Sequence, residues 1–409
     1  MGHDRASTPE SKQLSKPLRV RATDMRVMAI ALIVIALYVA VLFGGYVQHL
    51  WILDAHGHPV VNDFIVFWVA AHLALKGAAL AAYDAQREHM AELAAIGHTY
   101  YQVLGWSYPP LFLLIVMLPA KLPYVTAFIV WCSVTLALYA LTIAAIARRA
   151  IAAVVVCAMP WVLVEFMIGQ NGFLTAAVIG TALLHLEKRA WLCGLLLGFL
   201  TYKPQLGVLI PLALAAGGYW RAFGWAAFSA LLWNGIAGAV FGFDSYVAFL
   251  HALSNAADTH LVRSDLGWNK LQSLYGFARE LGLPAAAAWA MQALVSATAA
   301  FTVFVIWRNR NAPFALKAAL LPVAILLATP YVLYYDVPLL AVAGAFLFRQ
   351  RGFDRFELSV MTAAMPFLLT PLVPGWMVVP GALVASVAVG FIVVRRLQAQ
   401  PAYDFAYAR

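Results

Sequence analysis

Charged residues are scarce in this 409-residue sequence: Asp, Glu, Lys and Arg make up 11% of it, whereas hydrophobic residues make up 64%. Soluble domains are about half apolar and about a quarter charged, so this composition excludes an ordinary soluble protein. Apolar runs recur along nearly the whole chain, and about 20 apolar residues suffice for a helix to cross a bilayer. Alternating strands of the barrel type are missing, which leaves helices to satisfy the backbone in lipid. We therefore expect an all-α, polytopic integral membrane protein.

The sequence also lacks the usual motifs of soluble enzymes. We find no phosphate-cradling glycine loop, no strand–turn–helix nucleotide motif, and no Ser-His-Asp or Cys-His arrangement. Cys132, Cys157 and Cys193 all lie inside apolar runs without metal-ligand spacing, so they are interpreted as buried small hydrophobes. His56 and His58 stand two apart in a loop with no evident third ligand. We expect neither a metal nor a cofactor.

The first 26 residues, "MGHDRASTPESKQLSKPLRVRATDMR", are polar and carry six Lys and Arg against three Asp and Glu, a net +3 of the chain's +9. By the positive-inside rule this polar stretch, residues 1–26, is expected to be a disordered cytoplasmic tail. Its charge indicates topology and contact with membrane lipids rather than a nucleic-acid site. The next run, about 27–47, is too long for a signal-peptide core, so we expect it to remain as the first transmembrane helix.

We expect a single transmembrane domain over residues 27–396, with about 12–14 membrane segments, followed by a C-terminal tail at 397–409. Two polar regions, about 48–107 and 242–282, interrupt the apolar runs and are expected to be outer loops. This assignment follows from placing the basic clusters inside: Arg148-Arg149, Lys188-Arg189, Arg221, Arg308 with Arg310, Arg349 with Arg351, and Arg395-Arg396.

The topology is open between Tyr108 and Arg149, and the polar stretch 83–106 needs a place outside the membrane core. Between Tyr108 and Arg149 the basic clusters leave one crossing too many or too few. One short segment could be re-entrant, 64–82 could dip deeply into the membrane, or Arg148-Arg149 could face outward. The stretch 83–106 is too polar to span, but Met90 and Leu93 can share a helical face away from Glu88 and Glu92. We expect a helix lying along the membrane interface there.

One acid, Asp63, stands just ahead of the apolar run "FIVFWVAAHLAL" in the first outer loop. It could be the N-cap of a helix, since Asp is a favoured cap. It could instead be a chemical group, because a carboxylate at a lipid boundary is partly desolvated and becomes a stronger base.

Three stretches together carry a family resemblance: "DFIVFWVAAHLALKGAALAAYD", "WSYPPLFLLIVMLP" and "GQNGFLTAAVIGTALLHLEKRAWLCGLLLGFLTYKPQLGVLIPLAL". By their order and spacing, over roughly residues 60–345, the chain resembles glycosyltransferase family 87, the bacterial polyprenol-phosphate-dependent mannosyltransferases. The resemblance implies a GT-C fold in the inner (plasma) membrane, with the active site facing the periplasm or cell exterior. It implies transfer of a sugar, usually mannose, from a polyprenyl-phosphate donor to a lipid or glycan acceptor.

The resemblance also implies that a single aspartate in the first outer loop is the general base, and this position matches Asp63. The leaving phosphate needs positive charge at the outer face. Lys203 in "TYKPQLG" and His260 with Arg263 in the second loop are the candidates, with Lys270 and Asn269 behind them. The alternatives are a snorkelling lysine and an ordinary solvated loop.

Further candidates for sugar or acceptor binding lie at predicted outer turns. Gln170 and Asn171 could bond sugar hydroxyls, or "GQNG" could simply be a turn. Tyr108 precedes two prolines that could form a rigid helix start. Tyr335 and Asp336 in "YYD" could belong to an aromatic belt, or Asp336 could orient a cation or a sugar.

Two other functional classes fit a polytopic chain. A transporter or lipid flippase would suit helices broken by Gly and Pro, but the two halves of the sequence do not match and the polar residues gather at outer turns. A non-catalytic scaffold predicts that Asp63 matters only for helix capping. The sequence thus favours an inverting glycosyltransferase.

Overall fold

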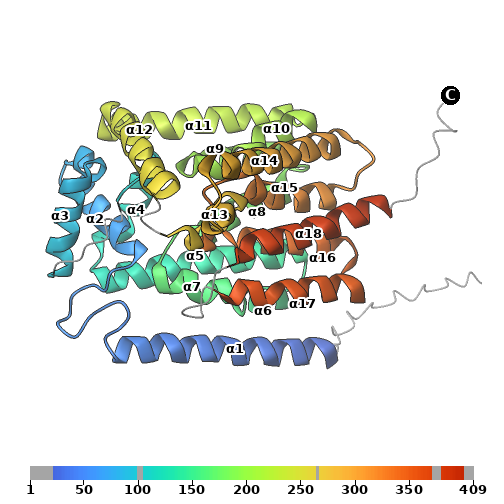
Figure 1. The fold of residues 1–409 in the computed structure, drawn as a ribbon, viewed down its shortest axis with the longest axis horizontal. Helices are drawn as coiled ribbons and strands as arrows, with labels where there is room; N and C mark the ends of the chain where they lie inside the picture. The colour runs from blue at the N-terminus through green and yellow to red at the C-terminus, as the bar shows by residue number, and fades with distance from the viewer. Residues whose placement is uncertain (1–21, 99–104, 264–266, 371–378, 400–409) are drawn as a thin grey trace, which may run out of the picture.

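The computed structural model describes residues 22–98, 105–263, 267–370 and 379–399. Across these residues the chain is helical and forms no named strand. The helices run side by side along one long axis (Figure 1). α1 begins and α18 ends at the same end of the bundle (Figure 1), where Arg149 pairs with Asp24 at 2.7 Å. We name this the basic end and the opposite one the site end.

Five of the described helices are long and apolar enough to cross a membrane, or six if the bent pair α6 and α7 counts as one span. They are α1 (Ala22–Val47), α5 (Tyr124–Ala147), α11 (Trp220–Phe241), α14 (Ala285–Arg308) and α18 (Gly381–Gln398). The chain is therefore a multi-pass, all-α membrane protein. α1 lies at the margin of the bundle, with only 6% of its apolar window buried.

The remaining apolar segments form helices that are too short to cross a membrane as single helices. Among the described residues, fewer helices are long enough to span than the predicted 12–14 membrane segments. Many of the short helices end at a Gly or Pro, which breaks the regular hydrogen bonding of a helix. They are α4 (Pro110–Val116), α6 (Ile151–Cys157), α7 (Pro160–Ile168), α8 (Gly172–His185), α9 (Ala190–Phe199), α10 (Leu209–Ala216), α15 (Phe314–Ala328), α16 (Leu339–Arg351) and α17 (Arg355–Leu369). Between α9 and α10 the backbone makes two 3₁₀ turns, Leu200–Tyr202 and Pro204–Leu206.

Between Tyr108 and Arg149 the structure has one short and one long helix. The seven residues of α4 rise about 10 Å, whereas the hydrocarbon layer is about 30 Å thick. A 3₁₀ turn at Pro119–Lys121 follows, and α5 then runs from Tyr124 to Ala147, just before Arg148 and Arg149. By length, only α5 can cross a bilayer here, and the number of crossings in the whole chain stays a prediction.

The site end carries the shorter helices α2 (Asp63–Leu75), α3 (Ala85–Ile96) and α12 (Asp244–Ala257), and α13 (Leu274–Glu280) lies further along the bundle (Figure 1). Of these, α2 and α12 line the candidate site. α2 is packed inside the bundle, with Phe64, Ile65 and Phe67 no more than 1% exposed. The predicted outer loops 48–107 and 242–282 therefore contain helices rather than open loops. The predicted tail boundaries at 26/27 and 396/397 fall inside helices, because α1 already begins at Ala22 and α18 continues to Gln398. The rest of both predicted tails, residues 1–21 and 400–409, lies outside the described residues.

The helix predicted in 83–106 is present as α3. Met90 is 60% exposed, whereas Glu88 and Glu92, which were predicted on another face, are fully buried. The sequence did not predict the burial of these two acids. Burial, together with the neighbouring charge of Glu92, raises the pKa of Glu88 to about 10. Glu88 is therefore neutral at pH 7, which removes the main cost of burying two adjacent acids. A pattern of residue types could not show this, because it treats every glutamate as charged.

Candidate active site

A cavity of about 440 Å³ opens at the site end and contains the acid that the sequence singled out. Its volume lies in the range of small-molecule sites, and its walls are mainly apolar and aromatic with few polar groups. α2, the residues before α4, the turns between α9 and α10, α12, and the residues after α15 contribute to these walls. Prominent lining residues are Asp63, Tyr108, Gln170, Gln205, Leu253, Tyr331 and Tyr335.

Asp63 is not the cap of α2. That role belongs to Asn62, whose Oδ1 accepts the Ile65 backbone N–H at 3.2 Å. Asp63 is the first residue of the helix, where the partial positive charge of the helix N-terminus favours a carboxylate. Its Oδ2 accepts a hydrogen bond from Gln170 Nε2 at 3.0 Å. The capping alternative therefore fails, and the carboxylate faces the cavity with one oxygen held by a neutral donor.

The surroundings of Asp63 strengthen it as a base. Burial raises the pKa of its carboxyl, while the hydrogen bond from Gln170 and the charge of Lys270 act in the opposite direction. The pKa remains above the ordinary value of an aspartic acid. A carboxylate whose pKa lies closer to neutrality accepts a proton more readily.

Each residue of "GQNG" has a separate structural role between α7 and α8. Gly169 ends α7 with φ +72°, and a Cβ there would come within 2.7 Å of Phe64 Cβ. Gln170 holds Asp63 and Asn171 accepts from Lys203. At Gly172 a Cβ would lie 1.8 Å from the Tyr335 carbonyl oxygen. The stretch is therefore a turn, but one that touches three distant parts of the chain.

Gln170 itself is fixed from several sides. Its Oε1 accepts from Tyr108 Oη at 3.0 Å and from the Asn171 backbone N–H at 3.2 Å. Trp131 Nε1 contacts the carbonyl oxygens of Gly169 and Gln170 at 3.0 and 3.1 Å. These bonds determine which end of the Gln170 amide faces Asp63, because its oxygen is already engaged and its nitrogen must donate. Gln170 thus orients Asp63.

Lys203 lies in a buried ion pair beside the cavity. Its Nζ is 2.6 Å from Asp336 Oδ1 and 2.8 Å from Asn171 Oδ1, and it lies 4.7 Å from the centre of the Tyr335 ring. Only 1% of Lys203 and 3% of Asp336 is exposed. Asp336 Oδ2 accepts the Leu333 backbone N–H at 3.1 Å. The lysine is therefore fully engaged by protein partners. Asp336 orients a cation, Lys203, which is one of the alternatives that the sequence left open for it.

Tyr108 and Tyr335, both predicted for sugar or acceptor binding, lie in the cavity wall. The prolines after Tyr108 also form the expected rigid helix start, since α4 begins at Pro110 with Pro109 as its N-cap residue. Tyr108 therefore lines the cavity and also precedes a rigid helix start. Two cavity residues that sequence reasoning missed are Tyr331 and Leu253. Tyr331 stands at the end of an apolar run, and Leu253 stands in the polar region 242–282, where no motif marks it.

The second-loop candidates are less close to the cavity. Arg263 is 70% exposed and pairs with Asp258 at 2.6 Å. The His260 side chain lies outside what the structure describes, so its role stays a prediction. Lys270 is exposed, and its positive charge acts to lower the pKa of Asp63. Among the described residues no group of three or more His, Cys, Asp or Glu side chains has metal-binding geometry.

The sequence comparison identifies the family. A family model described as Glycosyltransferase family 87 matches residues 106–330. The chain belongs to glycosyltransferase family 87. No curated protein and no solved structure was found that matches it.

The family 87 match includes Gln170, Asn171 and Lys203 but neither Asp63 nor Asp336. Both acids are nevertheless bonded directly to residues inside the matched region, at 3.0 Å and 2.6 Å. The site therefore joins the matched region to the parts of the chain before and after it. Family membership makes the protein a glycosyltransferase and favours this class over a transporter or a scaffold.

Breaking the ion pair should destabilise the protein. We expect Lys203→Met to lower the free energy of unfolding by about 3–5 kcal/mol, because Asp336 is left buried without its cation. The double variant Lys203→Met/Asp336→Leu should lose less than the sum of the two single variants. Thermal unfolding of the purified protein in detergent measures this.

The matched control is Lys76→Met, which removes an exposed lysine near the same end. A Lys203→Met variant as stable as Lys76→Met would show that the pair contributes nothing.

Proposed function

We propose that this family 87 glycosyltransferase moves a hexose, mannose, from a polyprenyl-phosphate donor to a lipid or glycan acceptor, with inversion at the anomeric carbon. Asp63 is the general base. The observation that supports this is the position of Asp63: it lies in the cavity wall, oriented by Gln170, with a raised pKa.

In the proposed reaction, the acceptor hydroxyl oxygen forms a bond to the anomeric carbon as the bond from that carbon to the phosphate oxygen breaks. The hydroxyl proton passes to the free oxygen of Asp63. The electron pair of the broken bond remains on the polyprenyl phosphate, which leaves. Attack from the face opposite the phosphate inverts the configuration. No metal or cofactor takes part in this proposal, and the donor lipid is a co-substrate.

The aromatic walls suit a sugar ring. Tyr108, Tyr331 and Tyr335 present rings to the cavity, and their hydroxyl groups give a polar handle on an apolar surface. Gln170, proposed from sequence as a sugar contact, instead acts through Asp63. Asn171 accepts a hydrogen bond from Lys203, so it holds the cavity wall behind the sugar in place and does not itself bond to the sugar.

The departing phosphate gains negative charge and needs a cation. We assign this role first to Lys270, whose charge already acts on Asp63, and then to Arg263 and His260 of the same segment. Lys203 is assigned a positioning role, since its three donors are directed at Asp336, Asn171 and the Tyr335 ring.

We propose that the site end faces the periplasm or cell exterior of a bacterial inner membrane. The support is the charge at the other end, where Arg149, Arg351 and Arg395 lie, because basic residues mark the cytoplasmic side. A GT-C arrangement is consistent with an acid in the first outer segment of an all-helical membrane enzyme.

Replacing the base should abolish transfer without unfolding the protein. We expect Asp63→Asn to reduce turnover by at least about 100-fold, the contribution of a general base. The assay uses purified protein in liposomes, labelled polyprenyl-phosphate mannose and a membrane lipid extract. Asp244→Asn, which removes an exposed acid at the same end, is the matched control. Equal transfer by all three proteins would remove Asp63 from the mechanism.

The pH profile should follow the ionisation of Asp63. Because the carboxylate form accepts the proton, the rate falls as the pH drops through its pKa, and this limb should lie above about 3.9, the ordinary value. Gln170→Leu and Lys270→Met each remove an interaction that lowers this pKa. Both variants should therefore move the acid limb to higher pH.

The profile of kcat against pH measures this shift, with Lys76→Met as the charge control. An acid limb that stays in place in both variants would mean that a different group titrates.

A further inference from the structure

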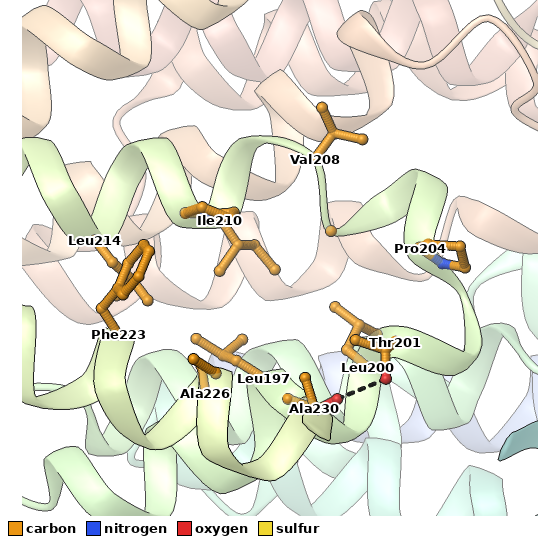
Figure 2. Close-up of a pocket in the computed structure, with 14 residues that line it drawn as sticks. Leu197, Leu200, Thr201, Pro204, Val208, Ile210, Leu214, Phe223, Ala226 and Ala230 are labelled. Atoms are coloured by element: carbon orange, nitrogen blue, oxygen red, sulfur yellow. Dashed lines mark hydrogen bonds between the residues drawn. The ribbon is translucent and has the colours of Figure 1, made fainter. Parts of the chain in front are cut away.

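Two apolar cavities lie elsewhere in the described part of the bundle, and they differ in their relation to the cavity that holds Asp63, which we name the reaction cavity. The first, of about 340 Å³, lies between α9, α10 and α11 (Figure 2), and its residues Pro204 and Val208 also line the reaction cavity. The second, of about 460 Å³, lies between the second half of α1 and the helices α5 and α7. None of the described residues that line this second space also lines the reaction cavity. We name it the α1 slot.

α1 is held to the bundle near the basic end and stands away from it towards the site end. Ala31, in the first half of α1, is buried, and the Tyr38 hydroxyl donates to the Ala158 carbonyl oxygen at 3.1 Å. Past Tyr38, the slot residues Val39 and Phe43 are 59% and 66% exposed. The slot is therefore open along one side. It is continuous with the lipid-facing surface of α1, a membrane span of whose apolar window only 6% is buried.

The opposite wall of the slot is fixed by contacts with distant parts of the chain. Trp51 Nε1 donates to the Met167 carbonyl oxygen at 3.0 Å, and its ring packs edge-on against Phe128. Ile52 is buried with φ +64°, a conformation that β-branched residues rarely adopt. Its carbonyl oxygen accepts the Val60 backbone N–H at 2.9 Å. Such a conformation persists only where the surroundings hold it, so this wall is formed in advance of any ligand.

The size and chemistry of the slot suit a single hydrocarbon chain. The slot follows α1 from Ile35 to Tyr46, a rise of about 17 Å, and a helix of that length and about 10 Å diameter fills about 1,300 Å³. At about 460 Å³ the slot is too small to take in a helix of a second copy. Its Trp51 indole and Tyr38 hydroxyl already donate to backbone carbonyl oxygens, so it offers little to a polar ligand. An acyl chain from the surrounding bilayer fits both properties.

A layer of buried aromatic rings divides the slot from the reaction cavity. Trp51 in the slot wall contacts Phe128, with ring centroids 5.8 Å apart. Phe128 in turn contacts Phe64 at 5.2 Å, and Phe64 contacts Phe67 of the reaction cavity at 6.3 Å. A chain in the slot is therefore cut off from Asp63, which favours a lipid that is not a substrate.

The wall formed by Trp51 and Ile52 leads to both members of the bonded pair in the site. Trp51 bonds to α7 at the third residue before Gln170. Ile52 bonds to Val60, the third residue before Asp63. A chain that fills the slot adds van der Waals contacts to this wall, and an empty slot forfeits them. Filling the slot therefore restrains both segments that carry the pair.

We infer that the α1 slot binds one acyl chain of a bilayer phospholipid that is not a substrate, and that this chain holds the segment before α2 in place. Because the slot exists only in the folded protein, the lipid stabilises that state by mass action. Such a lipid acts whatever sugar the enzyme transfers.

Filling the slot with a side chain should remove the benefit of the lipid. Leu42→Trp fills it from α1 and Ile129→Trp from α5, whereas Leu37→Trp and Leu141→Trp place the same side chain on exposed positions of these helices outside the slot. Delipidated protein in detergent is titrated with dioleoylphosphatidylcholine, and thermal unfolding is measured. At about 100 times its dissociation constant, the lipid should raise the melting temperature of the wild type and both controls by several degrees. In the two slot variants the shift should be less than half as large.

Hydrogen exchange of the peptide that covers residues 51–62 is followed in the same titration. Lipid should slow this exchange about tenfold in the wild type, because the slot wall opens less often, and leave it unchanged in Leu42→Trp. Equal melting shifts in slot variants and controls would overturn the inference, and so would exchange that lipid does not slow in the wild type.

A further measurement needs only the wild type. Phosphatidylcholine with a diazirine in one acyl chain is photolysed with the protein in nanodiscs, and the labelled peptides are mapped. Labelling of residues 35–46 and of α7 well above that of α11 and α14, which also face lipid, supports the inference. Labelling spread evenly over these helices would overturn it.

Other occupants of the slot give distinct results, and each would overturn the inference. Loss of the slot labelling on adding polyprenyl-phosphate mannose or membrane lipid extract in excess would assign the slot to a substrate. A dimer that native mass spectrometry detects for the wild type but not for Leu42→Trp would assign it to a second copy.

Discussion

The ion pair between Lys203 and Asp336 is the interaction on which the rest of the site depends. A charge buried in an apolar bundle is costly unless it is paired, so the two side chains hold each other in place. Through them the turn after α9, the turn after α15 and Asn171 at the start of α8 meet at one point. Gln170 lies next to Asn171, so this junction also determines where the donor to Asp63 is placed.

Two neighbouring cavities lie near this junction, and they differ in polarity. The larger one has polar groups at its wall and presents a carboxylate of raised pKa, as proton transfer requires. The smaller one is apolar and opens to lipid. The break between α9 and α10 borders both: Lys203 lies in the ion pair, while Pro204 and Val208 line both cavities.

The sequence predicted the fold class, because composition is a signal that does not depend on the fold. A lone acid before an apolar run drew attention to Asp63, but its role as a base came from the family resemblance and stays a proposal. The sequence could not separate Asp63 from Asn62 as the helix cap, since both residue types cap well and they are adjacent. It could not show that Lys203 is paired with Asp336, 133 residues further along the chain. The burial of Glu88 and Glu92 on α3 was not predicted, because the neutralisation of Glu88 depends on its three-dimensional surroundings. The shared lining of the two cavities likewise follows from packing alone.

The nature of the sugar donor tests the central claim most directly. Purified wild-type protein in liposomes is given labelled mannose on polyprenyl phosphate in one reaction and on a nucleotide in another, each with the same membrane lipid extract. The account predicts that label reaches a new lipid or glycan from the polyprenyl donor alone, with release of polyprenyl phosphate. Transfer from the nucleotide sugar, or label that crosses the bilayer still attached to its lipid, would contradict it.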